Sequence, residues 1–224
     1  MTAMLANPRV ELRIVDERNP TDPPRLGGSF LWFGGNPQSE NWLSPADHPS
    51  STKALEQISL CWSGTFADEL FAGDVRNWTR TGHAALGSWL DRTLPGFSAK
   101  GPLGIVPHHT HLLSDVAGQM RLWSARSEQG LATVLYPSGL IAPSMVGDIE
   151  DHLVRSISML GPRCSLCILE DIAPIAGEID SPTHFNRVPW GTGIIPRELV
   201  DQLLLEHLPS TTPLFIASNP PFFR

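Results

Sequence analysis

The sequence has little cysteine and almost no lysine, and each shortage excludes a class of protein. Its three cysteines, Cys61, Cys164 and Cys167, are too few for a disulfide framework, and the odd number favours a reducing compartment. We therefore expect a cytoplasmic protein. Phosphate contacts require a basic surface, so the scarcity of lysine and the net charge of -7 predict no nucleic-acid binding. The start of the chain does not look like a signal peptide, and no apolar run is long enough to span a membrane, so we expect no membrane insertion.

Proline, glycine and tryptophan are abundant instead. The 224 residues include 21 prolines, 19 glycines and 7 tryptophans, and 41% are hydrophobic. Such a composition is typical of an ordered protein with stiff turns and large aromatic anchors. A chain of this length can bury roughly 70% of its unfolded surface without disulfides. We expect one compact globular unit, built from a β-rich segment with a helix (1–97) and an α/β segment (98–224).

The first half of the chain has three candidate strands and one candidate helix. Residues 10–15 alternate apolar and polar side chains, and an aromatic run at 29–33 lies between two glycine pairs. We expect these two strands to pair in antiparallel fashion, and a third strand at 58–62. The glycine pairs lack the GxGxxG spacing of a dinucleotide-binding loop, which favours a turn role. A helix capped by Asp74 and ended by Pro95-Gly96 is predicted next, with its apolar side chains, Val75 and Trp78 among them, on one face.

The second half alternates strand and helix patterns. Apolar runs at 103–106, 131–136, 164–169 and 214–217 predict strands, and the segments between the runs carry apolar residues at helical spacing. The fold class that follows is α/β: N-terminal antiparallel β elements with a helix, followed by a βαβαβαβ, mostly parallel sheet.

Two groups of polar residues follow the predicted parallel strands. Glu170 and Asp171 end one strand, and His108, His109 and His111 follow another. Ligand groups in open α/β sheets gather beyond the carboxyl ends of the strands, so the two groups would converge if these strands are parallel neighbours, which the sequence does not decide. His109 and His111 would then bind zinc or manganese, and Asp171 and Glu170 would supply the catalytic carboxylates. We favour a simpler interpretation of the histidines, a polar turn that begins the next helix with Thr110 as the N-cap.

Two further patterns are better explained by structure than by chemistry. Cys164 and Cys167 are spaced as CxxC, but a strand places residues three apart on opposite faces, so we interpret them as buried structural cysteines. Ser138 follows a strand without the GxSxG pattern of a serine nucleophile, which favours a turn residue.

Aromatic residues in long polar segments are the candidates for binding. The segment 173–195 interrupts the strand and helix alternation, and within it Arg187 and Trp190 could grip an anionic group on an apolar platform. Trp42 lies in a second long segment, 36–51. Segments of this length without regular structure are uncommon unless they are used.

Two hypotheses of function follow, and the sequence does not decide whether the protein is an enzyme. We favour a non-catalytic partner-binding or accessory protein that uses Arg187, Trp190 and Trp42 on an acidic surface to bind a protein partner, with no cofactor. The alternative is a small metal-dependent hydrolase with His109, His111 and a carboxylate around zinc or manganese. The sequence leaves the oligomeric state open.

Overall fold

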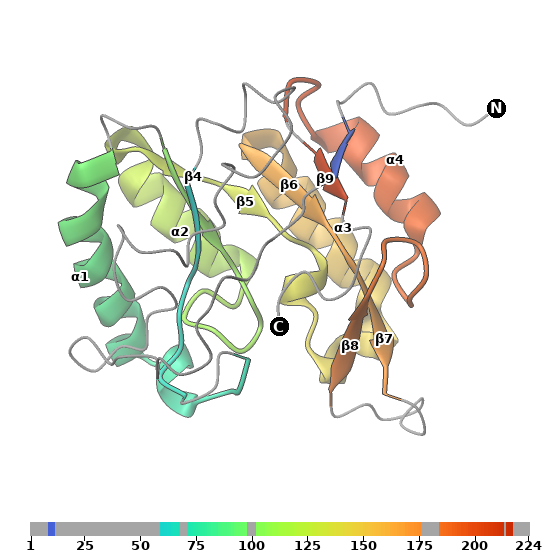
Figure 1. Ribbon diagram of the computed structural model, residues 1–224, viewed down its shortest axis with the longest axis horizontal. Coiled ribbons are helices and arrows are strands. Elements are labelled where there is room, and N and C mark those ends of the chain that lie inside the picture. Colours follow the sequence, from blue (N-terminus) through green and yellow to red (C-terminus); the bar gives the residue numbers. More distant parts are fainter. Residues whose placement is uncertain are drawn as a thin grey trace. The chain divides into compact units, whose positions relative to one another are not determined.

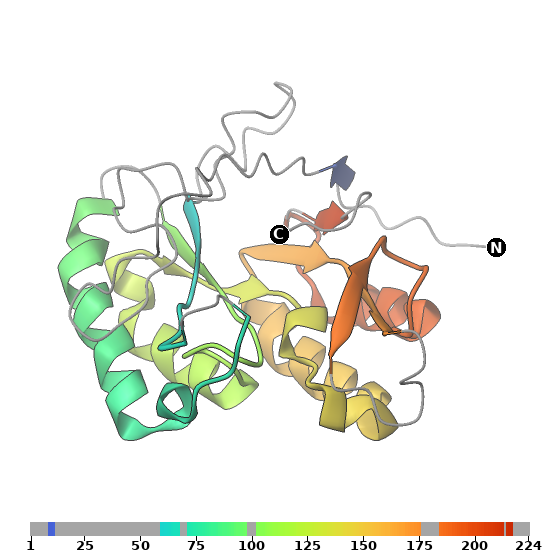
Figure 2. The same ribbon diagram turned by 60° about the horizontal axis from the view of Figure 1, so that its bottom comes forward.

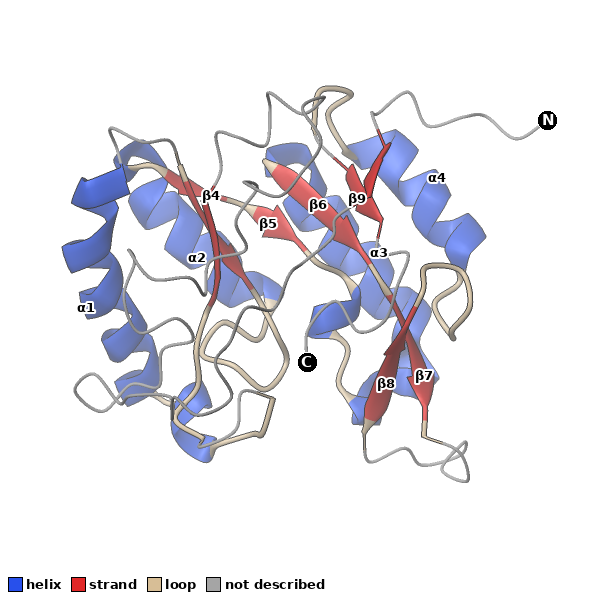
Figure 3. Ribbon diagram, viewed as in Figure 1, coloured by secondary structure: helices blue, strands red, loops and turns tan. Residues whose placement is uncertain are grey.

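The structure is a computed structural model that describes residues 9–11, 59–67, 71–97, 102–175, 184–212 and 214–216. The predicted strand at 29–33 and the segment 36–51 with Trp42 lie outside these residues. Helices and strands are both present, so the mixed α/β character is confirmed (Figures 1 and 3). The chain divides into two compact units: a central unit of residues 14–133, and a carboxy-terminal unit of residues 134–224 with residues 1–13.

The central unit contains a parallel sheet of three strands in the order β2-β3-β4. These are β2 (Ser59–Trp62), β3 (Leu103–Val106) and β4 (Leu131–Ala132). Cys61 lies opposite Ile105 in the register, and Leu103 lies opposite Leu131. All four residues of β3 are buried, which is the environment that a short, continuously apolar strand predicts.

The helix predicted from Asp74 is divided into two elements. Asp74 caps a 3-10 helix, η2 (Val75–Trp78), and the α-helix α1 (Arg80–Phe97) begins after Thr79, whose backbone is extended. A single amphipathic helix through this segment was therefore wrong, because the break at Thr79 changes which residues share a face. The helix also passes through Pro95 and Gly96, which were predicted to end it, and ends at Phe97.

The helix α2 (Val116–Arg126) begins later than its apolar pattern indicates. Asp115 is its N-cap and accepts a hydrogen bond from the N–H of Gly118 at 2.6 Å, so Thr110 is not the cap. A short 3-10 helix, η3 (Ser127–Gln129), follows α2. The two leucines before α2 join the core of this unit, whose buried members are Cys61, Phe66, Leu86, Trp89, Leu90, Leu94, Leu103, Ile105, Leu112, Leu113 and Leu131.

The carboxy-terminal unit contains a second parallel sheet, of four strands in the order β1-β9-β6-β5. These are β1 (Arg9–Glu11), β5 (Val134–Leu135), β6 (Leu166–Leu169) and β9 (Leu214–Ile216). The helices α3 (Ile149–Leu160) and α4 (Arg197–His207) lie side by side against one face of this sheet (Figures 1 and 2). Three 3-10 helices connect the elements: η4 (Ser138–Leu140), η5 (Pro143–Asp148) and η6 (Gly161–Arg163).

An antiparallel hairpin occupies part of the segment that the sequence predicts to be irregular. β7 (Asp171–Pro174) and β8 (Phe185–Val188) pair in register from Asp171 opposite Val188 to Pro174 opposite Phe185. The hairpin directly follows β6, so both of its strands begin or end next to the acidic end of that strand (Figure 1).

The predicted pairing of strands is not confirmed. The run 131–136 is divided at Thr133: β4 pairs with β3 in one sheet, and β5 pairs with β6 in the other. The N-terminal antiparallel elements are not confirmed either, since β1 pairs in parallel with β9 and β2 in parallel with β3. Apolar patterning locates a strand, whereas distant contacts choose its neighbour. Among the described residues, no helix combines the length and apolar character needed to cross a membrane.

Candidate functional site

Asp171 is fully buried at the start of β7, and its carboxylate is used by the backbone. Both oxygens accept hydrogen bonds from backbone N–H groups, which belong to Ile172 (2.8 Å), Gly191 (3.2 Å), Gly193 (2.9 Å) and Ile195 (3.0 Å). Three of these donors come from the loop between β8 and α4. This is the contact pattern of a carboxylate that shapes a loop, since convergent backbone N–H groups compensate a buried negative charge.

Two glycines allow this loop to reach Asp171. Gly191 has a φ of +83°, a backbone conformation that side chains with a Cβ rarely adopt. A Cβ at Gly193 would overlap with the carbonyl oxygen of Ile172 and with the carboxylate of Asp171. The loop therefore approaches Asp171 closely enough that only glycine fits at position 193.

Glu170 enters a different buried network, on which Tyr136 and Arg187 converge. Its Oε2 accepts a hydrogen bond from the hydroxyl of Tyr136 and lies 2.7 Å from Nη1 of Arg187. The guanidinium carbon of Arg187 lies 5.5 Å from the centre of the Tyr136 ring, within the range of a cation–π contact. Burial lowers the pKa of Arg187 to about 9, so the guanidinium remains protonated at neutral pH beside its carboxylate partner.

The three residues predicted to bind a partner differ in their exposure and surroundings. The side chain of Arg187 is only 12% exposed and faces Glu170. Trp190 is partly buried, in the loop that Asp171 organises. Trp42 lies outside the described residues. The contacts of Arg187 are those of a structural ion pair.

The predicted histidine cluster forms a packed aromatic group in the central unit. The ring centroid of His108 lies 4.4 Å from that of His109 and 5.0 Å from that of His111. His111 is fully buried, stacks on Phe71 at 5.7 Å and meets Trp62 edge to face at 5.3 Å. These are ordinary aromatic packing geometries. The cluster therefore has a clear role in packing the segment after β3.

No group of three or more potential metal-ligating side chains occurs among the described residues in an arrangement that could hold a metal ion. The histidines belong to the central unit and both carboxylates to the carboxy-terminal unit. Their predicted convergence stays a prediction. Independently of it, Asp171 and Glu170 are already engaged by the partners described above.

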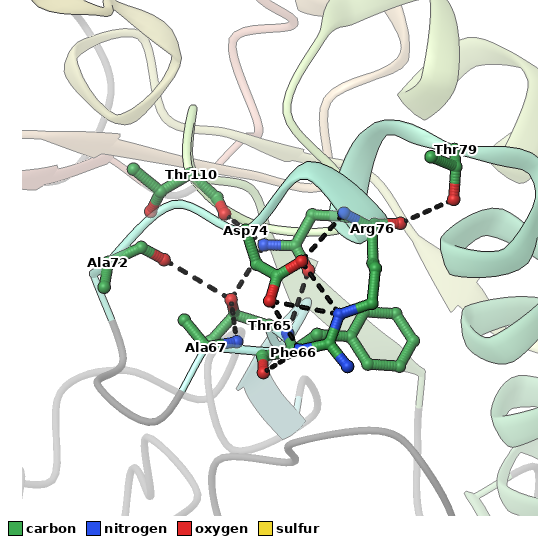
Figure 4. Close-up of polar contacts among 9 residues, drawn as sticks. Thr65, Phe66, Ala67, Ala72, Asp74, Arg76, Thr79 and Thr110 are labelled. Carbon is green, nitrogen blue, oxygen red and sulfur yellow. Dashed lines mark hydrogen bonds and ion pairs between the residues drawn. The ribbon is translucent and has the colours of Figure 1, made fainter.

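A second feature of the central unit is the segment around η2, which one buried side chain holds in place. Asn77 is completely buried: its Oδ1 accepts from the N–H of Phe66 at 2.8 Å, and its Nδ2 donates to Oγ1 of Thr65 at 2.7 Å and to the carbonyl of Thr110 at 2.6 Å. These bonds join η2 to the segment after β2 and to the turn of residues 108–111, which carries the three histidines. Figure 4 shows Thr65, Phe66 and Thr110 gathered around this point.

An ion pair fixes the outer side of the same segment. Nε of Arg76 donates to Oδ1 of Asp74 at 2.9 Å, and Nη2 of Arg76 donates to the carbonyl oxygen of Phe66 at 3.0 Å (Figure 4). The hydrogen bond and charge of Arg76 lower the pKa of Asp74 to about 2. The pair therefore stays ionised well below neutral pH, and η2 is held from both sides.

Two of the six exposed large apolar side chains among the described residues lie in this segment. Val75 is 71% exposed and Trp78 is 51% exposed. We define the Trp78 surface as the side chains of Val75, Arg76, Trp78 and Arg80. The apolar pattern placed Val75 and Trp78 on the inner face of a continuous helix, so this surface was not predicted from the sequence. Two arginines close to a tryptophan in the sequence could have indicated a binding surface.

Replacing Asn77 by alanine is expected to destabilise the central unit by about 2–3 kcal/mol. The change removes three hydrogen bonds and leaves buried backbone groups of Phe66 and Thr110 without these partners. Urea unfolding followed by circular dichroism measures the loss. Thr79, whose hydroxyl makes one exposed hydrogen bond to Arg76, offers the control: Thr79→Ala should change stability by less than about 1 kcal/mol.

The three cysteines are free and buried, and the burial of Cys164 and Cys167 agrees with the structural role predicted for them from the sequence. Burial raises the pKa of Cys164 to about 12 and raises the pKa of Cys61 and of Cys167 well above the ordinary thiol value. Because the thiolate is the reactive form, all three should be inert in the native protein. Titration with a thiol-specific disulfide reagent at pH 8 should detect three thiols in denaturant and essentially none without it. Rapid labelling of a native thiol would contradict this expectation.

No family model matches this sequence, and a search of curated proteins found none similar to it.

Proposed function

We propose that this chain is a non-catalytic partner-binding or accessory protein, and that the Trp78 surface is its recognition site. The observation that carries the proposal is the combination of exposure and rigidity at η2. Exposed tryptophan and valine side chains cost solubility, and tryptophan and arginine are the residues that most often dominate binding energy at protein interfaces.

The hydrogen-bond partners of Asp171 and Glu170 support a binding role over a catalytic one. Asp171 accepts four backbone hydrogen bonds, and Glu170 is bound by Tyr136 and Arg187. A general base must be able to reach the proton that it abstracts. Both oxygens of Asp171 and Oε2 of Glu170 are engaged by the protein itself, and both side chains are buried, so we interpret the two carboxylates as parts of the framework.

An aromatic photo-crosslinking amino acid at position 78 of the full chain keeps a large apolar ring in place of the indole and tests the proposal in the cells that produce the protein. We expect irradiation to give a discrete adduct of defined mass. The matched control carries the same probe at Ser88, an exposed position on α1, and should give no such adduct. The same probe at positions 42 and 190 tests the two tryptophans proposed from the sequence.

The outcomes separate the possibilities. An adduct at 78 that disappears with Val75→Asp supports recognition through the Trp78 surface. Adducts at 42 or 190 but not at 78 would move recognition to those tryptophans. The absence of an adduct at all three positions, in protein whose circular dichroism is unchanged, would contradict a partner-binding function.

The alternative of a small metal-dependent hydrolase has one observation in its favour. The ring centroids of His109 and His111 both lie within 5.0 Å of that of His108, and imidazole nitrogens are preferred ligands of zinc. Elemental analysis of untagged protein, with His109→Ala and His109→Ala/His111→Ala, tests this alternative. Stoichiometric metal that both variants lose would favour it. An absence of metal after incubation with zinc or manganese would remove it.

A further inference from the structure

The indole of Trp78 is exposed but held in place. An ideal Cβ at Gly73 would lie 3.4 Å from Cη2 of Trp78, so the ring lies against the backbone of that residue. The backbone of η2 is fixed by the buried Asn77, next to Trp78 in the chain. An aromatic side chain that is ordered before binding loses little conformational entropy on binding. The Trp78 surface is thus organised as an anchor site.

The charged members of the Trp78 surface are both cationic. Arg76 is 57% exposed, but the ionised Asp74 that pairs with it adjoins the surface and offsets one positive charge. Arg80 is exposed, and none of the ion pairs among the described residues includes it. The whole chain has a net charge of -7, so this surface is a local exception. Because salt screens charges beyond about 8 Å, a ligand bound here is influenced most by Arg76, Arg80 and Asp74, whose charges of +2 and -1 leave one net positive charge.

We propose that the Trp78 surface binds a short acidic segment of another protein that carries a large apolar side chain. This inference rests on the proposed function and adds the chemistry of the partner. The apolar side chain covers Trp78 and Val75, and carboxylates flanking it pair with Arg80 and with the exposed side of Arg76. The combination of an aromatic anchor and charge complementarity gives affinity and orientation together.

A short acidic segment fits better than a nucleic acid. A nucleic-acid strand carries a phosphate at every nucleotide, and phosphates beyond the Trp78 surface would face a chain whose net charge is negative. A few carboxylates can instead be confined to the two arginines. A second copy of this chain is the remaining occupant, and the experiment distinguishes it.

Panning a phage-displayed library of random 12-residue peptides on the full chain, with depletion on Trp78→Ala, tests the proposal. We expect the enriched peptides to share a Leu, Phe or Trp next to at least two Asp or Glu residues. For a synthetic peptide of the enriched sequence, fluorescence polarisation should give a Kd that Trp78→Ala raises about ten-fold or more. Raising the salt concentration should weaken binding.

Charge reversal at either end of α1 provides the matched pair of variants. Arg80→Glu should raise the peptide Kd at least about five-fold, because it places a carboxylate beside the bound carboxylates. Arg92→Glu makes the same change at an exposed position near the far end of the helix and should leave the Kd within about two-fold. Equal effects of the two variants would overturn the assignment of Arg80.

The remaining outcomes overturn the inference in distinguishable ways. Enriched peptides that depend on Trp78 but are neutral or basic would refute the acidic class and leave partner binding in place. Tighter binding of a labelled 20-nucleotide oligo-dT, sensitive to Trp78→Ala, would replace the peptide with a nucleic acid. A dimer in sedimentation equilibrium that Trp78→Ala dissociates would identify a second copy as the occupant. Failure of both panning and crosslinking at position 78 would refute the Trp78 surface as the recognition site, and absence of adducts at positions 42 and 190 as well would refute the proposed function itself.

Discussion

Replacing Asp171 by alanine is expected to lower the melting temperature by about 6–12 °C, which corresponds to at least about 3 kcal/mol for a chain of this size. The substitution leaves backbone donors of Gly191, Gly193 and Ile195 without their acceptor. Ile195 is buried and Gly193 partly buried, and each buried donor left without a partner costs about 1–3 kcal/mol. Thermal unfolding followed by circular dichroism measures the change. Asp201→Asn is the matched control: this carboxylate belongs to the same unit but pairs at 3.5 Å with an exposed Arg197, and its loss should have a small effect.

The glycine in the same network gives an independent check on the role of Asp171. Gly193→Ala should destabilise the protein strongly, because the new methyl group would overlap with Ile172 and Asp171. Gly147→Ala places a methyl group where no atom lies within 4 Å and should be tolerated. If Gly193→Ala and Asp171→Ala were both as stable as the parent, the loop would not be organised around this carboxylate.

Replacing Arg187 by methionine is expected to cost about 3–5 kcal/mol, because it leaves the buried charge of Glu170 without its counter-ion. The double variant Glu170→Gln/Arg187→Met removes both charges and should recover part of this loss. The two single variants and the double variant form a cycle whose coupling free energy is expected to be about 1–3 kcal/mol. Urea unfolding of the four proteins supplies the values.

An exposed ion pair on α3 is the control for this cycle. Arg155 and Asp151 lie one helical turn apart, 2.7 Å from each other, and more than half of each side chain is exposed. Arg155→Met should change the free energy of unfolding by less than about 1 kcal/mol. If Arg187→Met had an equally small effect, Arg187 would be available to a ligand, and its predicted role in binding would gain support.

The sequence predicted most of the buried elements. Leu166–Leu169 and Leu103–Val106 are fully buried strands, as their unbroken apolar runs indicate, and α3 buries Leu153 and Ile157 as its spacing predicts. Burial of apolar side chains is the dominant favourable term in folding, so the spacing of apolar residues along the sequence predicts which elements are buried. The first residues of helices were predicted less well. Asp115 caps α2 after two leucines that also fit a helical spacing, so the predicted helix began too early.

The Trp78 surface shows why exposure could not be predicted. Val75 and Trp78 have the spacing of an inner helical face, and they would share the burial of Leu86 and Leu90 if the helix were continuous. The break at Thr79 depends on Asn77, whose partners Thr65 and Thr110 are 12 and 33 residues away. Contacts at such separations are not encoded in local periodicity.

Glu170 and Asp171 mark the division between what the sequence determined and what only the tertiary structure decided. The sequence by itself determined that two acidic residues end a buried apolar strand. Their different partners depend on the fold, because successive residues of an extended chain point to opposite sides. Glu170 contacts Tyr136 and Arg187, whereas Asp171 contacts the backbone of residues 191–195. These partners are distant along the chain, and the buried carboxylates are stable only because folding brings compensating donors to them.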